Sequence, residues 1–313
     1  GGVVLSQGGG LELSGLDLAA FDGVGVALEG GRLDLDDVRM HAPLGAGLLV
    51  TAGAARARRL DIFDPRTDPT TNTASGVGVT GGEVTVERSY VRGGDRSYRV
   101  ALEGSLQVVD CVSDAPGADG FGVSAGARGQ IAGLRVLGPR NAGVAASGPG
   151  AVLGLAGAEI ERPGRIGLLV SDGAEANVDG LQVRQAANRG VSVISAGATL
   201  RAIQVEGAQD VGIQITDATA PVTVDGATLT DCGTSGLAAS GRMAEGLLLR
   251  GVSVTGTYDA GFDLAIGVHL YQSGARIEGL VARQNAGPGL QVEQSGARVA
   301  GATSGPRTGA TSS

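Results

Sequence analysis

The sequence predicts an all-β fold, a right-handed solenoid of parallel strands with about thirteen rungs of 21–24 residues. Two observations support it. A Gly-apolar-x-apolar segment returns at a nearly constant interval, and apolar and polar residues alternate within each segment. Alternation with a period of two indicates strands, because successive side chains of a strand point to opposite faces. A fixed repeat of this length is typical of stacked coils.

The first strand of each rung is expected to begin at a glycine or, once, at a serine. These residues are Gly2, Gly23, Gly47, Gly76, Ser97, Gly120, Gly143, Gly167, Gly190, Gly212, Gly236, Gly267 and Gly289. Ten of the twelve intervals between them fall between 21 and 24 residues. We therefore expect a single domain over residues 1–304 that starts within the solenoid, and a flexible polar tail over residues 305–313.

A second apolar block follows in each rung and has a small residue or Asp at its centre, as in Ile131–Val136 and Val178–Val183. Glycine inside a strand marks a bend or a bulge, so each second block is expected to turn a corner. The residues expected to fill the core of the central rungs are Leu168, Val170, Val178, Leu181, Val183, Val191, Val193, Leu200, Ile203 and Val205.

This repeat resembles that of right-handed parallel β-helix proteins of the pectin-lyase-like superfamily. Right-handed coiling is also the strong preference of crossovers between parallel strands. A leucine-rich repeat would need Asn or Cys after its strand, and a calcium-binding roll would need GGxGxD; the sequence has neither pattern. The superfamily includes lyases, hydrolases, epimerases, phage tailspikes, adhesins and non-catalytic surface proteins, so the resemblance implies a fold and leaves the function open.

Composition excludes several classes of protein. A net charge of −8 argues against nucleic-acid binding, which requires a basic surface. No run of 18 apolar residues is present, so no membrane span is expected. Cys111 and Cys232 lie five rungs apart, roughly 20 Å or more at the spacing of strands, so no disulfide is expected between them.

The third rung is long because it carries an insertion, residues 61–75, whose two X-Pro steps indicate an irregular loop. Acidic and basic residues gather in and near it, and they are expected to converge: Asp64, Asp68, Asp95, Asp114 and Asp119 with Arg66, Arg92, Arg96 and Arg99. Among these, Asp64, Asp68, Asp95, Arg96 and Arg99 are the candidate catalytic residues. Carboxylates bind Ca²⁺, which prefers oxygen ligands. The alternative is that they are ordinary turn and surface residues.

The resemblance implies that, beside bound Ca²⁺, an Arg acts at the α-carbon of an acidic sugar. Three catalytic signatures of the superfamily are incomplete in this chain, however. Asp36-Asp37 is the only Asp-Asp pair, and the Gly-His-Gly of polygalacturonases does not follow it. The segment Asp64-Pro65-Arg66-Thr67-Asp68 lacks the histidine of the Asp-Pro-His-Asp epimerase signature, and the tryptophan of the lyase signature is absent.

The eleventh rung carries a second insertion, residues 255–266. Aromatic residues and a histidine gather in and after it: Tyr258, Phe262, His269 and Tyr271. Because sugars stack on exposed aromatic rings, this group is the candidate ligand-binding patch for a carbohydrate. The alternative is a loop that packs its own aromatic side chains onto the solenoid wall.

A ladder of alternating charge is expected on one outer wall. The residue after the first apolar position of the second block is Asp36, Arg58 and Glu87 in successive rungs, and later Asp179, Arg201, Asp225, Arg250 and Glu278. Unlike charges that neighbour each other on one face stabilise strand pairing. A wall whose charges are already paired is a poor polysaccharide groove, so a binding site is expected elsewhere.

The sequence favours a non-catalytic bacterial protein, secreted or at the cell surface, that is a rigid scaffold and binds a polysaccharide or a surface protein. One alternative is a polysaccharide lyase or glycoside hydrolase that acts on an acidic or neutral polysaccharide. Another is a subunit of a larger fibre or surface assembly. No firm metal site is expected, and Ca²⁺ is the one cofactor that the acidic residues would suit.

Overall fold

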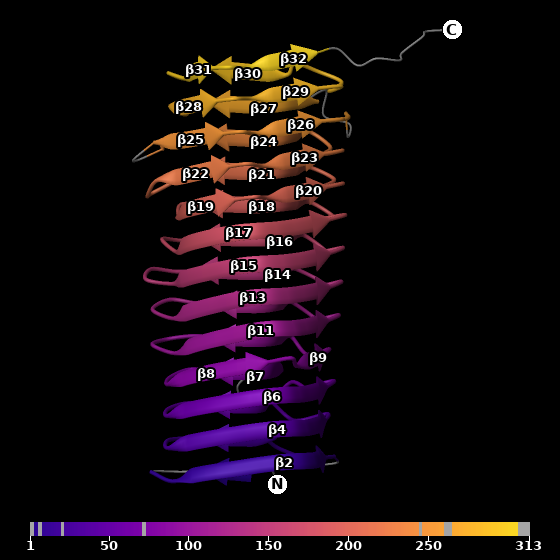
Figure 1. Cartoon of the computed structure of the whole chain (residues 1–313), viewed down its shortest axis with the longest axis vertical. Helices are drawn as coiled ribbons and strands as arrows, with labels where there is room; N and C mark the ends of the chain where they lie inside the picture. Colours follow the sequence, from indigo (N-terminus) through magenta and orange to yellow (C-terminus); the bar gives the residue numbers. More distant parts are fainter. Residues whose placement is uncertain are drawn as a thin grey trace, which may run out of the picture. The chain divides into compact units, whose positions relative to one another are not determined.

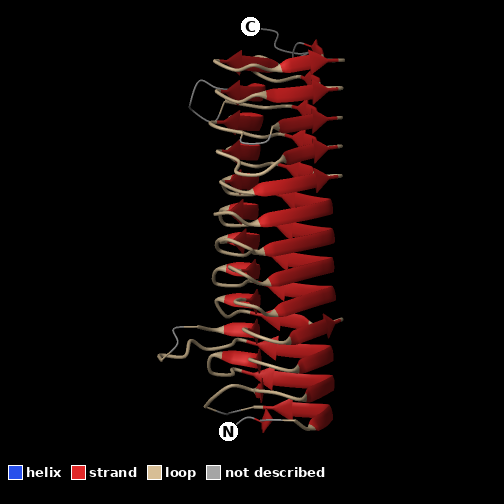
Figure 2. Ribbon diagram, turned by 90° about the vertical axis from the view of Figure 1, so that its left-hand side faces the viewer, coloured by secondary structure: helices blue, strands red, loops and turns tan. Residues whose placement is uncertain are grey.

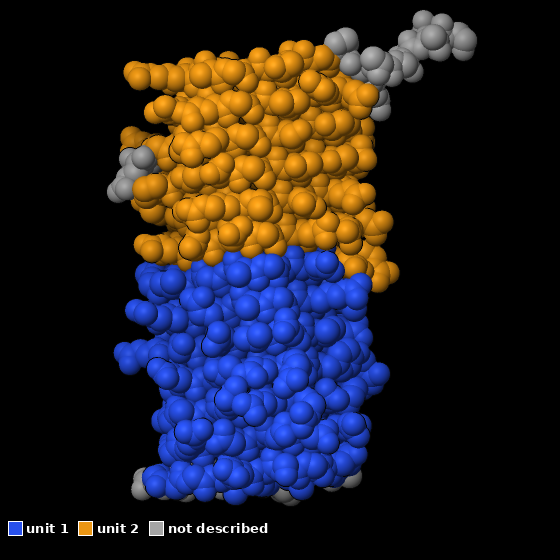
Figure 3. Space-filling model, viewed as in Figure 1, with its two compact units in different colours: residues 1–160 blue, residues 161–313 orange. Residues whose placement is uncertain are grey.

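The computed structural model describes residues 3–5, 8–19, 22–70, 73–243, 246–259 and 265–305. These residues form strands, turns and loops but no helix (Figure 2), so none of them makes a helix long and apolar enough to cross a membrane. The strands coil in about 12 turns, which confirms the predicted all-β parallel solenoid. Residues 1–160 and 161–313 form two compact units, which Figure 3 distinguishes by colour. The prediction of a single domain stays a prediction, and residues 306–313 of the predicted tail lie outside the described residues.

Each unit contains two parallel sheets, which we call the A sheet and the B sheet (Figure 1). In the first unit, the A sheet has the order β1 (Val3–Leu5), β3 (Val26–Leu28), β5 (Ala46–Val50), β7 (Ser75–Val79), β10 (Arg96–Val100), β12 (Asp119–Val123) and β14 (Ala142–Ser147). Its B sheet contains β2 (Gly10–Leu18), β4 (Arg32–His41), β6 (Ala54–Phe63), β8 (Glu83–Glu87), β9 (Tyr90–Arg92), β11 (Ser105–Asp114), β13 (Arg128–Leu137) and β15 (Val152–Glu161).

In the second unit, the A sheet has the order β16 (Ile166–Ser171), β18 (Arg189–Ile194), β21 (Val211–Thr216), β24 (Ser235–Ser240), β27 (Ile266–Tyr271) and β30 (Leu290–Glu293). Its B sheet contains β17 (Glu175–Arg184), β19 (Gly197–Arg201), β20 (Gln204–Glu206), β22 (Val222–Asp225), β23 (Thr228–Thr230), β25 (Leu247–Arg250), β26 (Ser253–Thr255), β28 (Ala275–Glu278), β29 (Val281–Arg283), β31 (Arg298–Ala300) and β32 (Thr303–Gly305).

Two predicted boundaries were wrong. Val26 pairs with Val3 and with Leu48, so the second rung begins its A strand at Gly25 and not at Gly23. The Gly-apolar-x-apolar pattern fits both glycines, and packing decides between them because Val26 and Leu28 must both point into the core, where both are fully buried. The first insertion is also shorter than expected, since residues 61–63 continue strand β6.

The predicted core is confirmed. All ten core residues named from the sequence, from Leu168 to Val205, are at most 1% exposed. The bend at the centre of the second block is also confirmed, because Gly133 and Gly180 have φ values of 73° and 74°. Both cysteines are free thiols inside the protein, as expected. Burial raises the pKa of the Cys232 thiol to about 12, so the group stays protonated and unreactive at neutral pH.

The glycine near the start of most A strands is required by close packing. A Cβ atom on Gly120 would lie 2.5 Å from Val136 Cγ1 on the B sheet and 2.6 Å from the Gly143 carbonyl oxygen. Ser97 is the exception, and its buried Oγ accepts a hydrogen bond of 2.7 Å from Ser113 Oγ. Ser113 occupies the register position of Val136. The smaller serine of the B sheet therefore makes room for the side chain of Ser97.

This complementarity predicts that a second substitution restores the stability lost through the first. Ser113→Val should lower the free energy of unfolding by roughly 2 kcal/mol, because the valine crowds Ser97 and leaves its hydroxyl without a partner. The double variant Ser97→Gly/Ser113→Val restores the arrangement of the other rungs and should recover most of that loss. Urea unfolding of the two single variants and the double variant measures the coupling. Additive losses would contradict the packing argument.

Candidate functional site

The structure separates the five candidate catalytic residues into two groups. Asp64 lies at a corner with φ 51°, and its carboxylate accepts a hydrogen bond of 2.7 Å from Arg92. It also lies over a glycine of the next rung, since a Cβ on Gly93 would be 3.1 Å from Asp64 Oδ1. Asp110 over Gly133 and Asp231 over Gly256 repeat this arrangement. The recurrence indicates a structural role for Asp64 in turning the chain at a corner.

Asp68 and Asp95 also lie in turns. Asp68 Oδ1 accepts hydrogen bonds from the backbone nitrogen and the hydroxyl of Thr70, at 2.8 and 2.7 Å, which closes a local turn. Asp95 is half-buried before strand β10. No three His, Cys, Asp or Glu side chains of the described ranges lie close enough together to hold a metal ion. Asp64, Asp68 and Asp95, the carboxylates that would suit Ca²⁺, therefore form no such group among the described residues.

The other two candidates, Arg96 and Arg99, lie on the outer face of the A sheet of the first unit. They line a hollow of about 170 Å³ together with Asp119, Gly122, Val123, Ser124, Ala145 and Ser147. The hollow exists because the neighbours of Arg99 are small: it pairs in register with Gly78 on β7 and with Gly122 on β12. The side chain of Arg96 crosses over Gly122, with its Cδ 3.6 Å from the position that a Cβ there would occupy.

Asp119 anchors one side of this A-sheet hollow. Asp119 is only 5% exposed. Its carboxylate accepts hydrogen bonds from Arg96 Nε at 3.0 Å, Asn141 Nδ2 at 2.7 Å and the Ala142 nitrogen at 3.2 Å. Asp119 and Arg96, which were predicted to converge, are therefore in contact. With all of these partners, Asp119 fixes the position of Arg96 and has little capacity left for a ligand.

Arg99 has no such counter-ion. No ion pair or hydrogen bond of its guanidinium is formed within the described part of the chain, and its side chain is half-buried. Burial and, to a lesser extent, the neighbouring Arg96 charge lower the pKa of Arg99, because both disfavour its charged form. Two guanidinium groups against one carboxylate make this hollow locally positive on an acidic chain. An anion that entered it would relieve the repulsion between Arg96 and Arg99.

The predicted aromatic patch is only partly assembled. His269 and Tyr271 lie on one face of strand β27, and His269 Nε2 is 3.5 Å from Glu293 Oε1. Tyr258 lies in the loop after β26, 37% exposed, and no ring contact joins it to His269 or Tyr271 within the described ranges. Phe262 lies outside the described residues. The patch therefore stays a prediction.

An aromatic stack that was not predicted from the sequence lies on the B sheet of the first unit. The rings of His41 and Phe63 stack with centroids 5.0 Å apart, Tyr90 lies 5.8 Å from Phe63, and Arg92 covers the Phe63 ring at 5.4 Å. Phe63 pairs in register with His41 and Arg92, so an alignment of the rungs would have revealed the stack. Its rings already stack on one another from one rung to the next. The faces of Phe63 are therefore occupied, and the stack is not a platform for sugars.

The Tyr90 hydroxyl belongs to this stack and is also occupied, because it donates a hydrogen bond of 2.6 Å to Asp114 Oδ2. Partial burial and the Asp114 carboxylate raise the pKa of Tyr90 to about 12. The phenol is therefore neutral at physiological pH and is not a base.

The charge ladder on the B-sheet wall is confirmed in register. Arg201 pairs with Asp179 and Asp225 on the neighbouring strands, and Arg250 pairs with Asp225 and Glu278. Arg250 forms ion pairs with both of its neighbours, at 3.7 and 3.2 Å, whereas Arg201 donates to Asn177 at 3.3 Å. Exposed pairs of this kind contribute little stability individually, roughly 0.2–1 kcal/mol.

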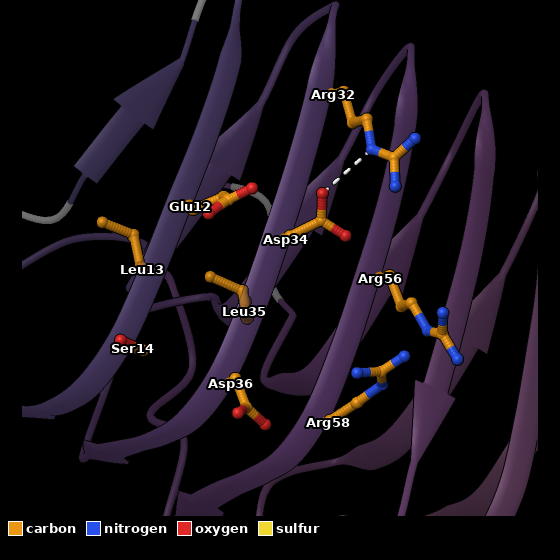
Figure 4. A pocket seen from close by; sticks show the side chains of 9 residues that line it. All are labelled: Glu12, Leu13, Ser14, Arg32, Asp34, Leu35, Asp36, Arg56 and Arg58. Carbon is orange, nitrogen blue, oxygen red and sulfur yellow. Dashed lines mark hydrogen bonds and ion pairs between the residues drawn. The ribbon is translucent and has the colours of Figure 1, made fainter.

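The outer face of the B sheet in the first unit contains a hollow of about 430 Å³, shown in Figure 4. Figure 4 shows Arg32 beside Asp34, with Arg56 and Arg58 on the next strand. These charges are paired: Arg32 with Asp34 at 2.9 Å, and Arg56 with Glu87 at 2.7 Å. A charged ligand would have to displace these partners, so this hollow is a weaker candidate than the one at Arg99.

Comparison with known proteins identifies the fold. Residues 157–303 match the family model described as a right-handed β-helix region. The fold is a right-handed parallel β-helix. This match confirms the fold that the predicted resemblance implied. No curated protein matches the sequence of this β-helix.

Two of the solved structures that resemble this β-helix show how far the likeness reaches. One is the catalytic domain of a GH87 α-1,3-glucanase in complex with nigerose, with a TM-score of 0.55 and 13% identity over 96% of this chain. This chain spans 63% of the length of that glucanase chain. The other is the A-module of the mannuronan C-5 epimerase AlgE4 of Azotobacter vinelandii, with a TM-score of 0.51 and 14% identity over 96% of this chain and 91% of the epimerase. At these identities the likeness establishes the fold and transfers no catalytic residue.

Proposed function

We propose that this β-helix is a non-catalytic scaffold that binds an acidic polysaccharide in the A-sheet hollow at Arg96 and Arg99. The two similar structures support a carbohydrate as the ligand class, because one is a glucanase described with a bound disaccharide and the other is a mannuronan epimerase. In this proposal the protein is secreted or displayed at the surface of a bacterium, where such polymers occur.

Arg99 carries the proposal. Its guanidinium is half-buried in a hollow, lies beside a second guanidinium and has no counter-ion within the described ranges. Arginine binds carboxylates with two parallel hydrogen bonds and remains charged in proteins. A uronate carboxylate would supply the missing negative charge. Ser147 in the lining of the hollow offers a hydroxyl partner for the sugar, and the Ser124 hydroxyl, which donates to the Val100 carbonyl oxygen at 3.3 Å, can still accept.

The non-catalytic part of the proposal rests on the carboxylates. Glycoside hydrolysis needs two carboxyl groups on either side of the scissile bond. The residues that line the A-sheet hollow include one carboxylate, Asp119, and it is held by Arg96, Asn141 and a backbone nitrogen. A lyase would need a base, and arginine does not give up its proton in proteins. Binding without turnover is what this arrangement supports.

The test is a titration with trimannuronate. We expect Arg99→Gln to weaken binding at least tenfold, because a charge-assisted bidentate contact is lost. Arg128→Gln is the matched control, since this exposed arginine lies on the B sheet of the same unit and should leave affinity unchanged. Affinity should also fall as salt is raised, as screening weakens ionic contacts. Equal affinity of both variants would contradict the proposal.

The same samples separate binding from catalysis. When the wild-type protein is incubated with acidic and neutral polysaccharides, we expect it to form neither unsaturated sugar ends, the product of a lyase, nor new reducing ends, the product of a hydrolase. If the wild-type protein forms such ends and Asp119→Asn does not, the lyase or hydrolase alternative is established instead.

A further inference from the structure

A further hollow, of about 330 Å³, lies on the outer face of the B sheet of the second unit, on the neighbouring strands β22, β25 and β28 (Figure 1). We call it the Arg276 hollow, and the residues that line it include Thr223, Leu248, Arg250, Arg276 and Glu278. Gly246 also lines it, and nothing lies within 4 Å of the position that a Cβ there would occupy, so this side of the hollow is open.

The alternation of charge on this wall breaks down beside the Arg276 hollow. Leu248 pairs in register with Thr223 on one side and with Arg276 on the other. Arg276 in turn pairs with Arg298 on β31, so two arginines follow each other at the spacing of strands, about 4.8 Å. Like charges in register disfavour strand pairing. An anion held between the two guanidinium groups would remove this repulsion.

The nearest carboxylate cannot neutralise both arginines. Glu278 Oε1 forms an ion pair of 2.6 Å with Arg276, and Glu278 Oε2 accepts a hydrogen bond of 3.2 Å from Arg250. The hydrogen bond from Arg250 and the charge of Arg276 lower the pKa of the Glu278 carboxyl group, so it is ionised at neutral pH. Arg298 is exposed and forms no ion pair or hydrogen bond with any residue that the structure describes. Its positive charge is therefore left without a counter-ion.

The hollow also has apolar surface and a free hydroxyl group. Leu248 occupies an outward position on this charged wall and is half-buried. Thr223, its neighbour in register, is half-buried too, and its hydroxyl makes no hydrogen bond within the described part of this unit. A uronate sugar complements all three features, because it has an apolar C–H face, hydroxyl groups and a carboxylate.

We infer that a second binding site for a uronate unit of an acidic polysaccharide is formed by Thr223, Leu248, Arg276 and Arg298. The class of ligand rests on the proposed function, whereas the residues belong to the other unit and the other sheet. Arginine binds a carboxylate with two parallel hydrogen bonds, and here the carboxylate would lie between Arg276 and Arg298. Both arginines are exposed, so water screens their charges more than that of Arg99, and this site should bind more weakly.

The test is a titration of the full chain with trimannuronate in the Arg99→Gln background, which lacks the stronger site. This variant should retain a weaker phase of binding. Adding Arg298→Gln should weaken that phase at least fivefold, because a charge-assisted hydrogen bond is lost. Arg283→Gln is the matched control, since this exposed arginine lies on β29 of the same sheet and should leave the phase unchanged. Equal affinity with Arg298→Gln and with Arg283→Gln would overturn the inference.

Leu248→Ser separates binding in the hollow from attraction by charge alone, since it changes no charge. In the same background it should weaken the binding of trimannuronate roughly threefold, because apolar contact with the sugar is lost. Thr223→Val keeps the shape of the side chain, removes the hydroxyl and should weaken binding roughly fivefold, which keeps the test valid if Leu248→Ser folds poorly. Unchanged affinity in the folded variants would show that only surface charge attracts the ligand, and would overturn the site.

Chemical modification gives a readout at individual residues. Phenylglyoxal reacts with exposed guanidinium groups, and peptide mass spectrometry reports which of them have reacted. Trimannuronate should slow the modification of Arg276 and Arg298 in the wild-type protein and leave that of Arg283 unchanged, whereas uncharged maltotriose should protect none of them. Equal protection of Arg283 by trimannuronate would show indiscriminate binding to arginines and would overturn the inference.

The outcomes also separate this inference from the proposed function. If Arg99→Gln removes all binding of trimannuronate, the second site is rejected and the proposed function stands. If Arg99→Gln binds like the wild type and Arg298→Gln binds more weakly, the second site stands and the function proposed for the hollow at Arg99 is rejected. If the wild-type protein does not bind trimannuronate, both are rejected.

Discussion

Replacement of Ile203 by aspartate is expected to lower the free energy of unfolding by roughly 3–5 kcal/mol, because an unpaired charge would be buried. Ile203 is 0% exposed in the B-sheet core of the second unit. The loss should depend on pH. Burial raises the pKa of the new carboxyl group above its value in the unfolded chain, so the neutral form is favoured in the folded state. The penalty is therefore largest at neutral pH and shrinks as the pH falls toward 4.

Urea unfolding at pH 7 and at pH 4 measures both effects. The control is Gln204→Asp, one residue further along, where the side chain is exposed and a change within about 0.5 kcal/mol is expected. If Ile203→Asp unfolds like the wild type at pH 7, the assignment of inward and outward positions between β19 and β20 is wrong.

Replacement of Gly190 by alanine should cost roughly 3 kcal/mol, although alanine is the smallest possible addition. The new Cβ would lie 2.4 Å from Val205 Cγ1 and 2.6 Å from the Gly212 carbonyl oxygen, far inside van der Waals contact. One of these atoms belongs to the backbone of the next rung and cannot move without breaking strand pairing. The cost is therefore that of overpacking a rigid site.

Gly274→Ala is the matched control, because nothing lies within 4 Å of the position of its Cβ. This variant should be neutral or slightly stabilising, since alanine reduces the freedom of the unfolded chain. Thermal melting of both variants checks the pair. Equal melting temperatures would show that the A strand is farther from the B sheet than the structure has it.

The repeat itself was predictable because every rung obeys the same constraint. A parallel stack places equivalent residues directly above one another, so inward positions such as Val178 and Leu200 must stay apolar and outward positions such as Asp179 and Arg201 can alternate in charge. The core and the charge ladder could therefore both be predicted from a single sequence. The second rung was misplaced by two residues only because Gly23 and Gly25 both fit the pattern.

The candidate sites were less predictable, because they depend on what lies beside a residue in neighbouring rungs. Arg99 was singled out from its charge, but its importance comes from Gly78 and Gly122 on either side. Asp64 was singled out in the same way, and the structure pairs it with Arg92 at a corner. The stack of His41 and Phe63 was missed, because those residues are 22 positions apart and were read separately.

The sequence by itself determined the all-β solenoid, its period, its core and the alternation of charge on one wall. Each of these follows from a local rule repeated in every rung, so periodicity reveals it without coordinates. Only the tertiary structure decided which charges are neutralised, which polar atoms are left without partners and where small residues open a hollow. These properties arise between side chains on adjacent strands, where rotamers and packing rather than periodicity determine the contacts.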